Sequence, residues 1–195
     1  MLLISVLLLA AYLVGSVSFA WLAGRLKGVD LRQHGSGNLG ATNAGRTLGG
    51  AWFAIVFIAD VAKGALPVLL VRLLLPIDLV PVELPLLAVL TGAAAVLGHV
   101  FTCFHGFRGG KAVATSLGVL IGLVPLVAGL GAGIWLITWL LARKGFGMSS
   151  SDAVSPASLL AAAAIAPIQI LVHEQAWGRG LPITILVLAL SLLVL

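Results

Sequence analysis

Seven apolar runs fill most of this 195-residue chain and constrain its fold more than any other feature. They lie at about residues 1–24, 50–75, 83–104, 112–124, 125–142, 154–172 and 181–195. A helix needs about 20 apolar residues to cross the hydrocarbon of a bilayer. The runs therefore predict an all-α integral membrane protein with seven transmembrane helices, built as a single polytopic domain over residues 1–195.

Composition supports a chain that is largely surrounded by lipid. Apolar residues make up 61% of the sequence and charged residues 9%, whereas soluble domains average about 45–50% and about 25%. A globule in water cannot hide that much apolar surface, which excludes a soluble enzyme, a disordered chain and a nucleic-acid-binding domain. The single cysteine excludes a disulfide framework and a zinc site built from thiolates.

Three of the runs need interpretation. The first ends in small residues, as a cleaved signal peptide does, but it has no basic start and six more runs follow, so we interpret it as a span. The block 112–142 is too long for one helix, and Pro125 predicts two helices joined by a tight turn, the first of them unusually short. The last run covers only about 22 Å as a helix and ends without a charged anchor, so we expect the chain to be truncated there.

The positive charges favour one side of the predicted membrane. The net charge is +5, from 11 Lys and Arg against 6 Asp and Glu. Seven spans place the loops 25–47, 105–111 and 143–153 on one side, and these loops hold eight of the eleven cations: Arg25, Lys27, Arg32, Arg46, Arg108, Lys111, Arg143 and Lys144. Arg72 and Arg179 fall on the other side. The positive-inside rule then predicts cytoplasmic basic loops, an N-terminus outside and a cytoplasmic C-terminus.

The longest polar stretch, residues 32–46, resembles an anion-binding loop. Its glycines at 35, 37 and 40 form a G-x-G-x-x-G pattern, but an apolar helix precedes it, whereas a dinucleotide fold requires a strand. Glycines still let backbone N–H groups approach an anion closely. Neutral donors and one cation accompany them: Ser36, Asn38, Thr42, Asn43 and Arg46. The alternative is a solvated turn between two helices.

A second polar cluster, residues 98–115, contains Gly109, Gly110 and Lys111. It is not a P-loop, because His105 and Ala112 occupy the positions that need glycine and Ser or Thr. A glycine-flanked lysine at a helix start still favours an anion, and Arg108 strengthens that prediction. The alternative is that both cations only anchor the topology. No metal is expected, because the spacing of His99, Cys103 and His105 matches no common site. We expect His99 to orient a loop by hydrogen bonding instead.

Asp60 and Lys63 lie inside the second apolar run, three residues apart on one helical face. Ionisable groups inside a membrane are costly, and they usually pair or line a polar cavity. Two interpretations stay open, a self-neutralising structural pair and a direct role in binding substrate.

Together these segments resemble the bacterial acyl-phosphate:glycerol-3-phosphate acyltransferases, the PlsY family. The resemblance rests on GSGNLGATN at residues 35–43, DVAKG at 60–64, GHVF at 98–101 and FRGGKAVAT at 107–115. It implies an enzyme of phospholipid biosynthesis that moves an acyl group from acyl phosphate to the 1-hydroxyl of glycerol 3-phosphate, giving lysophosphatidic acid and phosphate. It further implies a multi-pass protein of the bacterial inner membrane, with an active site facing the cytoplasm. No cofactor or nucleic acid is expected, membrane lipid is an expected partner, and a monomer is the working hypothesis.

The resemblance and the charges together suggest roles for individual residues. Catalytic roles are expected for Ser36, Arg46 and Lys111. Substrate binding is expected for Gly35, Gly37, Asn38, Gly40, Thr42, Asn43, Asp60, Lys63, His99, Arg108, Gly109 and Gly110. No Ser-His-Asp grouping is evident, so we expect direct attack by the glycerol hydroxyl with a substrate phosphate as the base. The rival function is a membrane transporter of a small phosphorylated anion, although the paired interruptions typical of transporters are missing.

The sequence departs from the family pattern at three points. Thr102 stands where the family usually has proline, and Ala112 where it has glycine. The third signature of the family, an Arg/His-x-x-Asn-Ile…Arg…Gly-x-Glu stretch after the last span, is missing and supplies active-site groups in relatives. We therefore expect either an inactive chain or an incomplete sequence.

Overall fold

The computed structural model describes residues 1–76, 83–172 and 180–194. Within these ranges the chain is helical and forms no strand. The α-helices are α1 (Leu2–Ser16), α2 (Phe19–Leu26), α3 (Ala41–Leu48), α4 (Gly50–Leu74), α5 (Leu84–Val100), α6 (Val113–Leu123), α7 (Pro125–Gly145), α8 (Val154–Val172) and α9 (Leu181–Val194). Two short 3₁₀ turns, η1 (Leu31–Gln33) and η3 (Cys103–His105), lie in the connections. Arg179, assigned above to the outer side, falls outside the described residues.

Every apolar run of the sequence contains a helix within its described part. Five stretches are long and apolar enough to cross a membrane: Leu2–Leu26, Gly50–Leu74, Leu84–His105, Pro125–Gly145 and Val154–Val172. The helices α6 and α9 are apolar but shorter, at 11 and 14 residues. The all-helical membrane class is thus confirmed, whereas the count of seven spans stays a prediction.

Two local features differ from the expectation. The first run is two helices rather than one, because the Ser18 side chain caps α2 by accepting the Trp21 N–H at 3.2 Å. The polar segment before residue 50 contains α3, which forms because Ala41 and Ala44 on one helical face are buried against the core. The predicted turn between α6 and α7 is confirmed at Val124 and Pro125.

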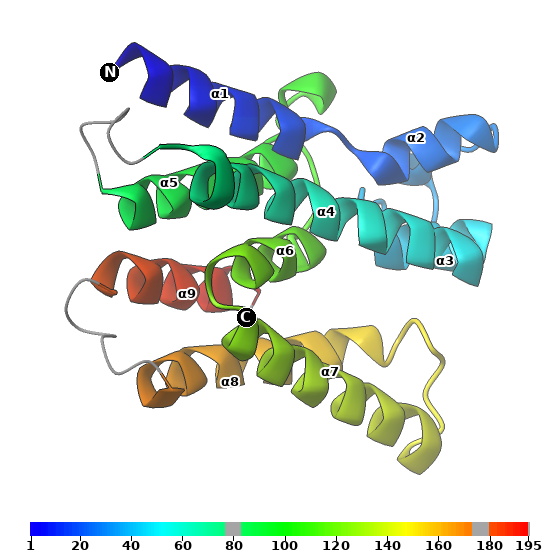
Figure 1. The fold of residues 1–195 in the computed structure, drawn as a ribbon. Coiled ribbons are helices and arrows are strands. Elements are labelled where there is room, and N and C mark those ends of the chain that lie inside the picture. The colour runs from blue at the N-terminus through cyan, green and yellow to red at the C-terminus, as the bar shows by residue number, and fades with distance from the viewer. Residues whose placement is uncertain (77–82, 173–179, 195) are drawn as a thin grey trace. The chain divides into compact units, whose positions relative to one another are not determined.

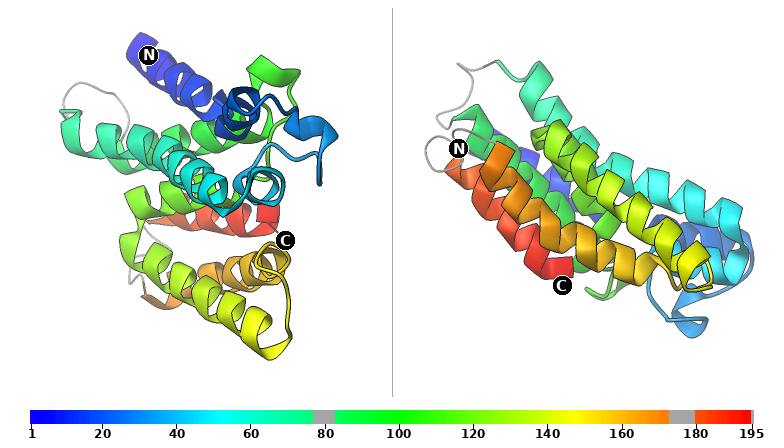
Figure 2. Two further views of the ribbon diagram at one scale, coloured as in Figure 1. Left: turned by 90° about the vertical axis from the view of Figure 1, so that its right-hand side faces the viewer. Right: turned by 90° about the horizontal axis from the view of Figure 1, so that it is seen from below.

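The chain divides into two compact units, Met1–Leu123 and Val124–Leu195. The two polar stretches identified above, residues 32–46 and 98–115, both belong to the first unit and are called the first and second glycine-rich segments below. In the second unit α8 packs against both α7 and α9 (Figure 2). There the Trp135 indole donates to the Ser158 hydroxyl at 3.2 Å, and the Trp139 indole donates to the Ser150 carbonyl at 3.0 Å. The prediction of a single membrane domain stays a prediction.

Glycines bring the helices of the first unit into close contact. A side chain at Gly98 of α5 would meet the backbone of α1, and one at Gly118 of α6 would meet the backbone of α4. Small residues of this kind drive helix association in membranes, where backbones must approach closely. The helices α1 and α5 run in one direction, and α4 and α6 run in the other (Figure 1).

This arrangement gathers both glycine-rich segments at one end of the first unit. At the opposite end, the Arg72 guanidinium donates to the carbonyl oxygens of Gly122 and Leu123, the latter at 3.0 Å. These carbonyls end the short helix α6 and have no partner within it. Arg72 therefore closes α6 far from the polar segments.

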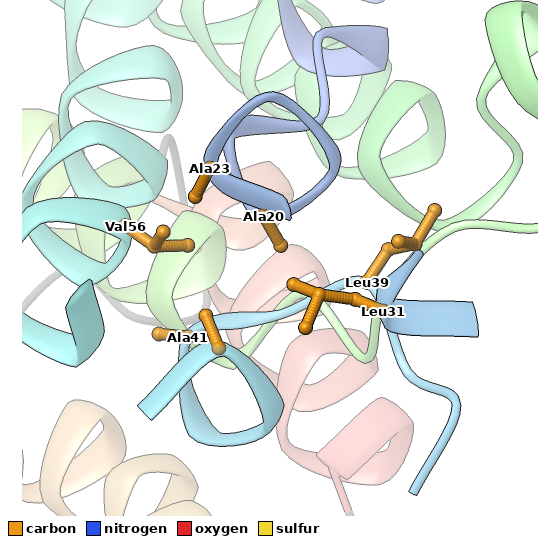
Figure 3. Packing of buried hydrophobic residues seen from close by; sticks show 7 residues of the cluster. Ala20, Ala23, Leu31, Leu39, Ala41 and Val56 are labelled. Carbon is orange, nitrogen blue, oxygen red and sulfur yellow. The ribbon is translucent and has the colours of Figure 1, made fainter. Parts of the chain in front are cut away.

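A small apolar cluster supports the first glycine-rich segment. Ala20 of α2 points toward Leu39 of the segment and toward Leu31 just before it, and Ala23 points toward Val56 (Figure 3). The cluster also includes Ala41 and Ala44 of α3 and Val56 of α4. The direction of α2 therefore determines where the segment lies.

Candidate functional site

Asn43 of α3 holds the first glycine-rich segment from inside. Its side chain is only 1% exposed, and its Oδ1 accepts the backbone N–H of Ser36 at 2.9 Å. Its Nδ2 donates to the carbonyls of Leu31 at 3.0 Å and His34 at 3.1 Å. A side chain at Gly35 would collide with the same amide. The Asn43 amide is thus engaged within the segment, although the sequence suggested that it contacts substrate.

Replacing Asn43 by alanine is expected to loosen this segment without unfolding the protein. Each net hydrogen bond is worth about 1 kcal/mol, so the loss of all three corresponds to roughly 150-fold faster amide exchange in residues 34–38. Hydrogen–deuterium exchange with mass spectrometry measures this change. The control is Asn38→Ala, which leaves the three Asn43 hydrogen bonds in place. Equal protection in Asn43→Ala and wild type would contradict this role.

Arg32 is neutralised locally, although it lies among the cations of the segment. Its guanidinium pairs with the Asp30 carboxylate at 2.8 Å, and its backbone N–H also donates to that carboxylate at 3.1 Å. These contacts lower the pKa of Asp30 to about 2. Since a lowered carboxyl pKa keeps the pair charged above that value, Arg32 stays paired throughout the physiological range. Arg32 therefore adds little free positive charge to the site.

The second glycine-rich segment folds back onto the end of α5. The N–H of Gly109 donates to the Val100 carbonyl at 2.9 Å, and the N–H of Gly110 donates to the His99 carbonyl at 3.1 Å. A side chain at Gly110 would meet the His99 ring and, at 3.0 Å, the carbonyl oxygen of Leu39. The two glycine-rich segments are therefore in direct contact at Leu39 and Gly110, which are 71 residues apart in the sequence.

Ala112 lies directly after this contact in a left-handed backbone conformation, with φ of 56°. This conformation explains why the family that the sequence resembles usually has glycine at position 112, because a left-handed backbone costs an L-residue roughly 1–2 kcal/mol. The Ala112 methyl is buried, with 1% of the residue exposed. Burial of a methyl contributes about 0.8 kcal/mol, and alanine also restricts the unfolded chain by about 0.4–1 kcal/mol.

These opposing contributions predict that Ala112→Gly is close to neutral. The change in unfolding free energy should stay within about 1 kcal/mol. Thermal unfolding in detergent, followed by circular dichroism, compares the variant with wild type and with Ala112→Val, whose β-branch resists this conformation. A melting temperature of Ala112→Gly that corresponds to a gain of much more than about 1 kcal/mol in unfolding free energy would show that the backbone strain at Ala112 dominates.

The expected catalytic residues lie on the surface of this end of the unit. Ser36, Arg46, Arg108 and Lys111 are all exposed, with Arg46 in the last turn of α3 and Lys111 two residues before α6. Within the described part of the chain, neither Arg108 nor Lys111 forms an ion pair. Cations that are not neutralised by carboxylates are suited to binding phosphate.

Asp60, Lys63 and His99 are placed differently, because they are buried beneath the segments at 2%, 3% and 6% exposure. The Lys63 ammonium pairs with Asp60 Oδ1 at 2.8 Å. His99 Nδ1 lies 3.1 Å from the Thr115 hydroxyl and 3.8 Å from Asp60 Oδ1. Of the two interpretations, burial and pairing favour the structural pair. No group of three metal-ligating side chains occurs among the described residues.

Two polar residues that sequence reasoning left unassigned join α1 to the end of α5. The Tyr12 hydroxyl donates to the Phe101 carbonyl at 2.6 Å, and the Thr102 hydroxyl donates to the Ser16 carbonyl at 2.6 Å. Thr102 has φ of −63°, a value that proline also adopts, so the backbone suits either residue. Two features of the sequence could have pointed to these contacts: Tyr12 is the only tyrosine of the chain, and position 102 holds threonine where the family usually has proline.

Comparison with known proteins agrees with this geometry. The family model described as glycerol-3-phosphate acyltransferase matches residues 5–195. The glycerol-3-phosphate acyltransferase of Desulforudis audaxviator is 45% identical over 156 residues, which are 80% of this chain and 70% of the relative. That of Geotalea daltonii is 43% identical over 190 residues, covering 97% of this chain and 87% of the relative.

Solved structures extend the likeness to the fold. The crystal structure of PlsY, an integral membrane glycerol 3-phosphate acyltransferase, in its glycerol 3-phosphate form has a TM-score of 0.81 and 35% identity. The match covers 98% of this chain and 86% of PlsY. The lysophosphatidic acid form has a TM-score of 0.79 and 34% identity, with 98% and 85% covered. The chain therefore belongs to the glycerol-3-phosphate acyltransferase family, and its fold is that of the integral membrane enzyme PlsY.

Proposed function

We propose that the chain transfers an acyl group from acyl phosphate to the 1-hydroxyl of glycerol 3-phosphate, releasing lysophosphatidic acid and phosphate. The observation that carries this proposal is the contact of the two glycine-rich segments at Gly110 and Leu39. It joins a segment with neutral donors to a segment whose cations, Arg108 and Lys111, form no ion pair with any described residue. A site for two phosphate-bearing substrates requires both kinds of group in one place.

In this site the cations bind phosphate and stabilise the charge that develops at the acyl carbonyl oxygen. We assign this role to Lys111 and Arg46, supported by Arg108. Ser36, Asn38 and Thr42 orient the glycerol. Backbone N–H groups of Gly35 and Gly40 supply further donors to the phosphates. Those of Gly37, Gly109 and Gly110 donate to the carbonyls of His34, Val100 and His99 and so shape the two segments around the substrates.

The reaction proceeds by direct transfer. The 1-oxygen of glycerol 3-phosphate bonds to the acyl carbon, and the bond between that carbon and the phosphate oxygen breaks. The hydroxyl proton passes to a substrate phosphate, and inorganic phosphate leaves. This route is favoured because no described side chain contacts the Ser36 hydroxyl as a base: His34 Nδ1 bonds the Asp30 carbonyl at 2.8 Å, and His99 bonds Thr115.

Ser36→Ala is expected to lower activity about 10–100-fold, because a binding hydroxyl contributes a hydrogen bond and no covalent step. Mass spectrometry of wild type after incubation with acyl phosphate should detect no acyl group on Ser36. A chemically competent acyl adduct on this residue would overturn direct transfer in favour of a covalent intermediate.

We further propose seven membrane crossings in a bacterial inner membrane, with the site facing the cytoplasm and the acyl chain in an apolar groove open to lipid. Two observations support this topology. Successive long helices of the first unit alternate in direction, and both glycine-rich segments lie at one end of it (Figure 1). That end carries six of the eight cations that the positive-inside rule places in the cytoplasm.

The test uses the protein purified in detergent, acyl phosphate and labelled glycerol 3-phosphate. We expect labelled lysophosphatidic acid and one phosphate released for each acyl group transferred. Acyl-coenzyme A in place of acyl phosphate should give no product. Uptake of labelled glycerol 3-phosphate into proteoliposomes without any transfer would favour a transporter instead.

A further inference from the structure

The break between α1 and α2 leaves two backbone carbonyls without a helical partner. In a continuous helix, the carbonyls of Ser16 and Val17 would accept N–H groups four residues further along. The Trp21 N–H bonds the Ser18 side chain instead. The Thr102 hydroxyl donates to the Ser16 carbonyl at 2.6 Å, and the Lys63 ammonium donates to the Val17 carbonyl at 2.7 Å.

Lys63 is fully engaged at this break. Besides the Val17 carbonyl it contacts Asp60 Oδ1 at 2.8 Å and lies 5.7 Å from the centre of the Phe19 ring. Only 3% of the residue is exposed. A charge is costly to bury unless it is paired and hydrogen-bonded. Asp60 alone could neutralise the ammonium, so the bond to Val17 is an additional tie between α4 and the break.

The same charge pair extends toward the second glycine-rich segment. Asp60 Oδ1 lies 3.8 Å from His99 Nδ1, which is also 3.1 Å from the Thr115 hydroxyl. His99 in turn contacts Gly110, through its carbonyl at 3.1 Å and through its ring. The buried Asp60 carboxylate thus lies next to His99, which in turn contacts Gly110, the residue directly before Lys111.

The break also determines the position of the first segment. The helix α2 begins directly after it, and its Ala20 packs with Leu31 and Leu39 in one apolar cluster (Figure 3). A rotation of α2 about the break would therefore move Leu39 relative to Gly110, where the two segments touch.

We propose that Lys63, together with Asp60 and Thr102, is a positioning residue that fixes the α1–α2 break and so holds the two glycine-rich segments in register. This inference rests on the proposed function, because it assigns the register to the acyl-transfer site. None of the three residues needs to touch substrate. Proline, the usual residue at position 102, has no hydroxyl, so the hydrogen bond from Thr102 to the Ser16 carbonyl can form only in chains that have a donor side chain there.

The first experiment replaces the charge pair by neutral side chains of similar size, Asp60→Asn with Lys63→Met. Removing both charges together avoids leaving one of them unpaired in the core. We expect the protein to insert, with kcat/KM for glycerol 3-phosphate about 100-fold lower, since small misplacements of reacting groups cost about that much. Loss should appear in both KM and kcat.

Arg72→Met is the matched control. Arg72 lies on the same helix and also donates to backbone carbonyls, but at the opposite end of the unit. It is expected to lower thermal stability while leaving kcat/KM within about threefold of wild type, because distant sites act independently.

A second measurement reports the register without turnover. Spin labels are attached at Gln33 and Phe104, which are both exposed, in a background with Cys103→Ser. Electron–electron double resonance should give a narrow distance distribution in wild type and a broad or shifted one in the double variant. The Arg72→Met variant should keep the narrow distribution.

Unchanged kcat/KM and an unchanged distance distribution in the double variant would overturn the positioning role. If that variant does not insert, Thr102→Val decides by the same two readouts. It keeps both charges, removes only the partner of the Ser16 carbonyl, and is expected to lower kcat/KM about tenfold with a broadened distribution; unchanged values would overturn the proposal. Wild type without any transfer would overturn the proposed function instead, and the distance measurement would still decide the positioning role.

Discussion

Lys111→Ala is expected to lower kcat/KM for glycerol 3-phosphate by about 10²–10³-fold, or roughly 3–4 kcal/mol of transition-state stabilisation. Lys111 follows Gly110, where the two glycine-rich segments touch, and it is exposed. No described carboxylate pairs with it. Its charge is therefore available for a phosphate and for the oxygen that becomes negative during transfer.

The matched control for this prediction is Lys144→Ala. Lys144 is also an exposed lysine next to a glycine, but it lies in the last turn of α7 in the other unit. Initial rates in detergent are measured for both variants, and gel filtration with circular dichroism verifies that each is folded. Activity of Lys111→Ala within about threefold of wild type would remove Lys111 from the site.

The helices could be predicted from the sequence because lipid imposes a simple rule on them. Each span must bury about 20 residues of backbone in hydrocarbon, so long apolar runs and their interruptions coincide with helices and turns. The helix α8 occupies 154–172, the range predicted. The long apolar block 112–142 was predicted to form two helices that meet at Pro125, and α7 begins at that residue. Hydropathy, with a proline to divide the longest block, is enough to predict these two boundaries.

The break at Val17 and Ser18 could not be predicted in the same way. Both residues lie in an apolar run, and hydropathy does not register which carbonyls lose their helical partners. The break is stable because Lys63 and Thr102 reach it from α4 and from the end of α5. These partners are 46 and 86 residues away, so only the tertiary structure reveals the pairing.

The set of candidate site residues could be predicted from the sequence, but which of them face substrate and which support the site could not. Chemistry identifies donors and cations in both glycine-rich segments, whereas burial decides which of them face outward. Asn43 and Ser36 carry similar polar groups seven residues apart, yet Asn43 is 1% exposed and bonded within the segment while Ser36 is exposed. The sequence pattern treats them alike because it contains no information on which helical face meets the core.

Orientation in the membrane gives the second large prediction, an all-or-none labelling result. Single cysteines are placed at Gln33, Phe104, Ser150 and Glu83, all exposed positions, in a background with Cys103→Ser. Gln33 is preferred to Gly37, whose φ of 71° a cysteine side chain would strain. An impermeant thiol reagent added to intact cells should label only the cysteine at Glu83, and permeabilised cells should show all four.

This result follows from the charge distribution and the helix directions together. Gln33 and Phe104 lie in the two polar connections at one end of the first unit, among cations that resist translocation, whereas Glu83 precedes α5 at the other end. Labelling of both Gln33 and Phe104 from outside would invert the topology but leave the site intact. Labelling of one without the other would be more damaging, because segments on opposite sides of a membrane cannot meet at Gly110 to bind the two phosphates of one reaction.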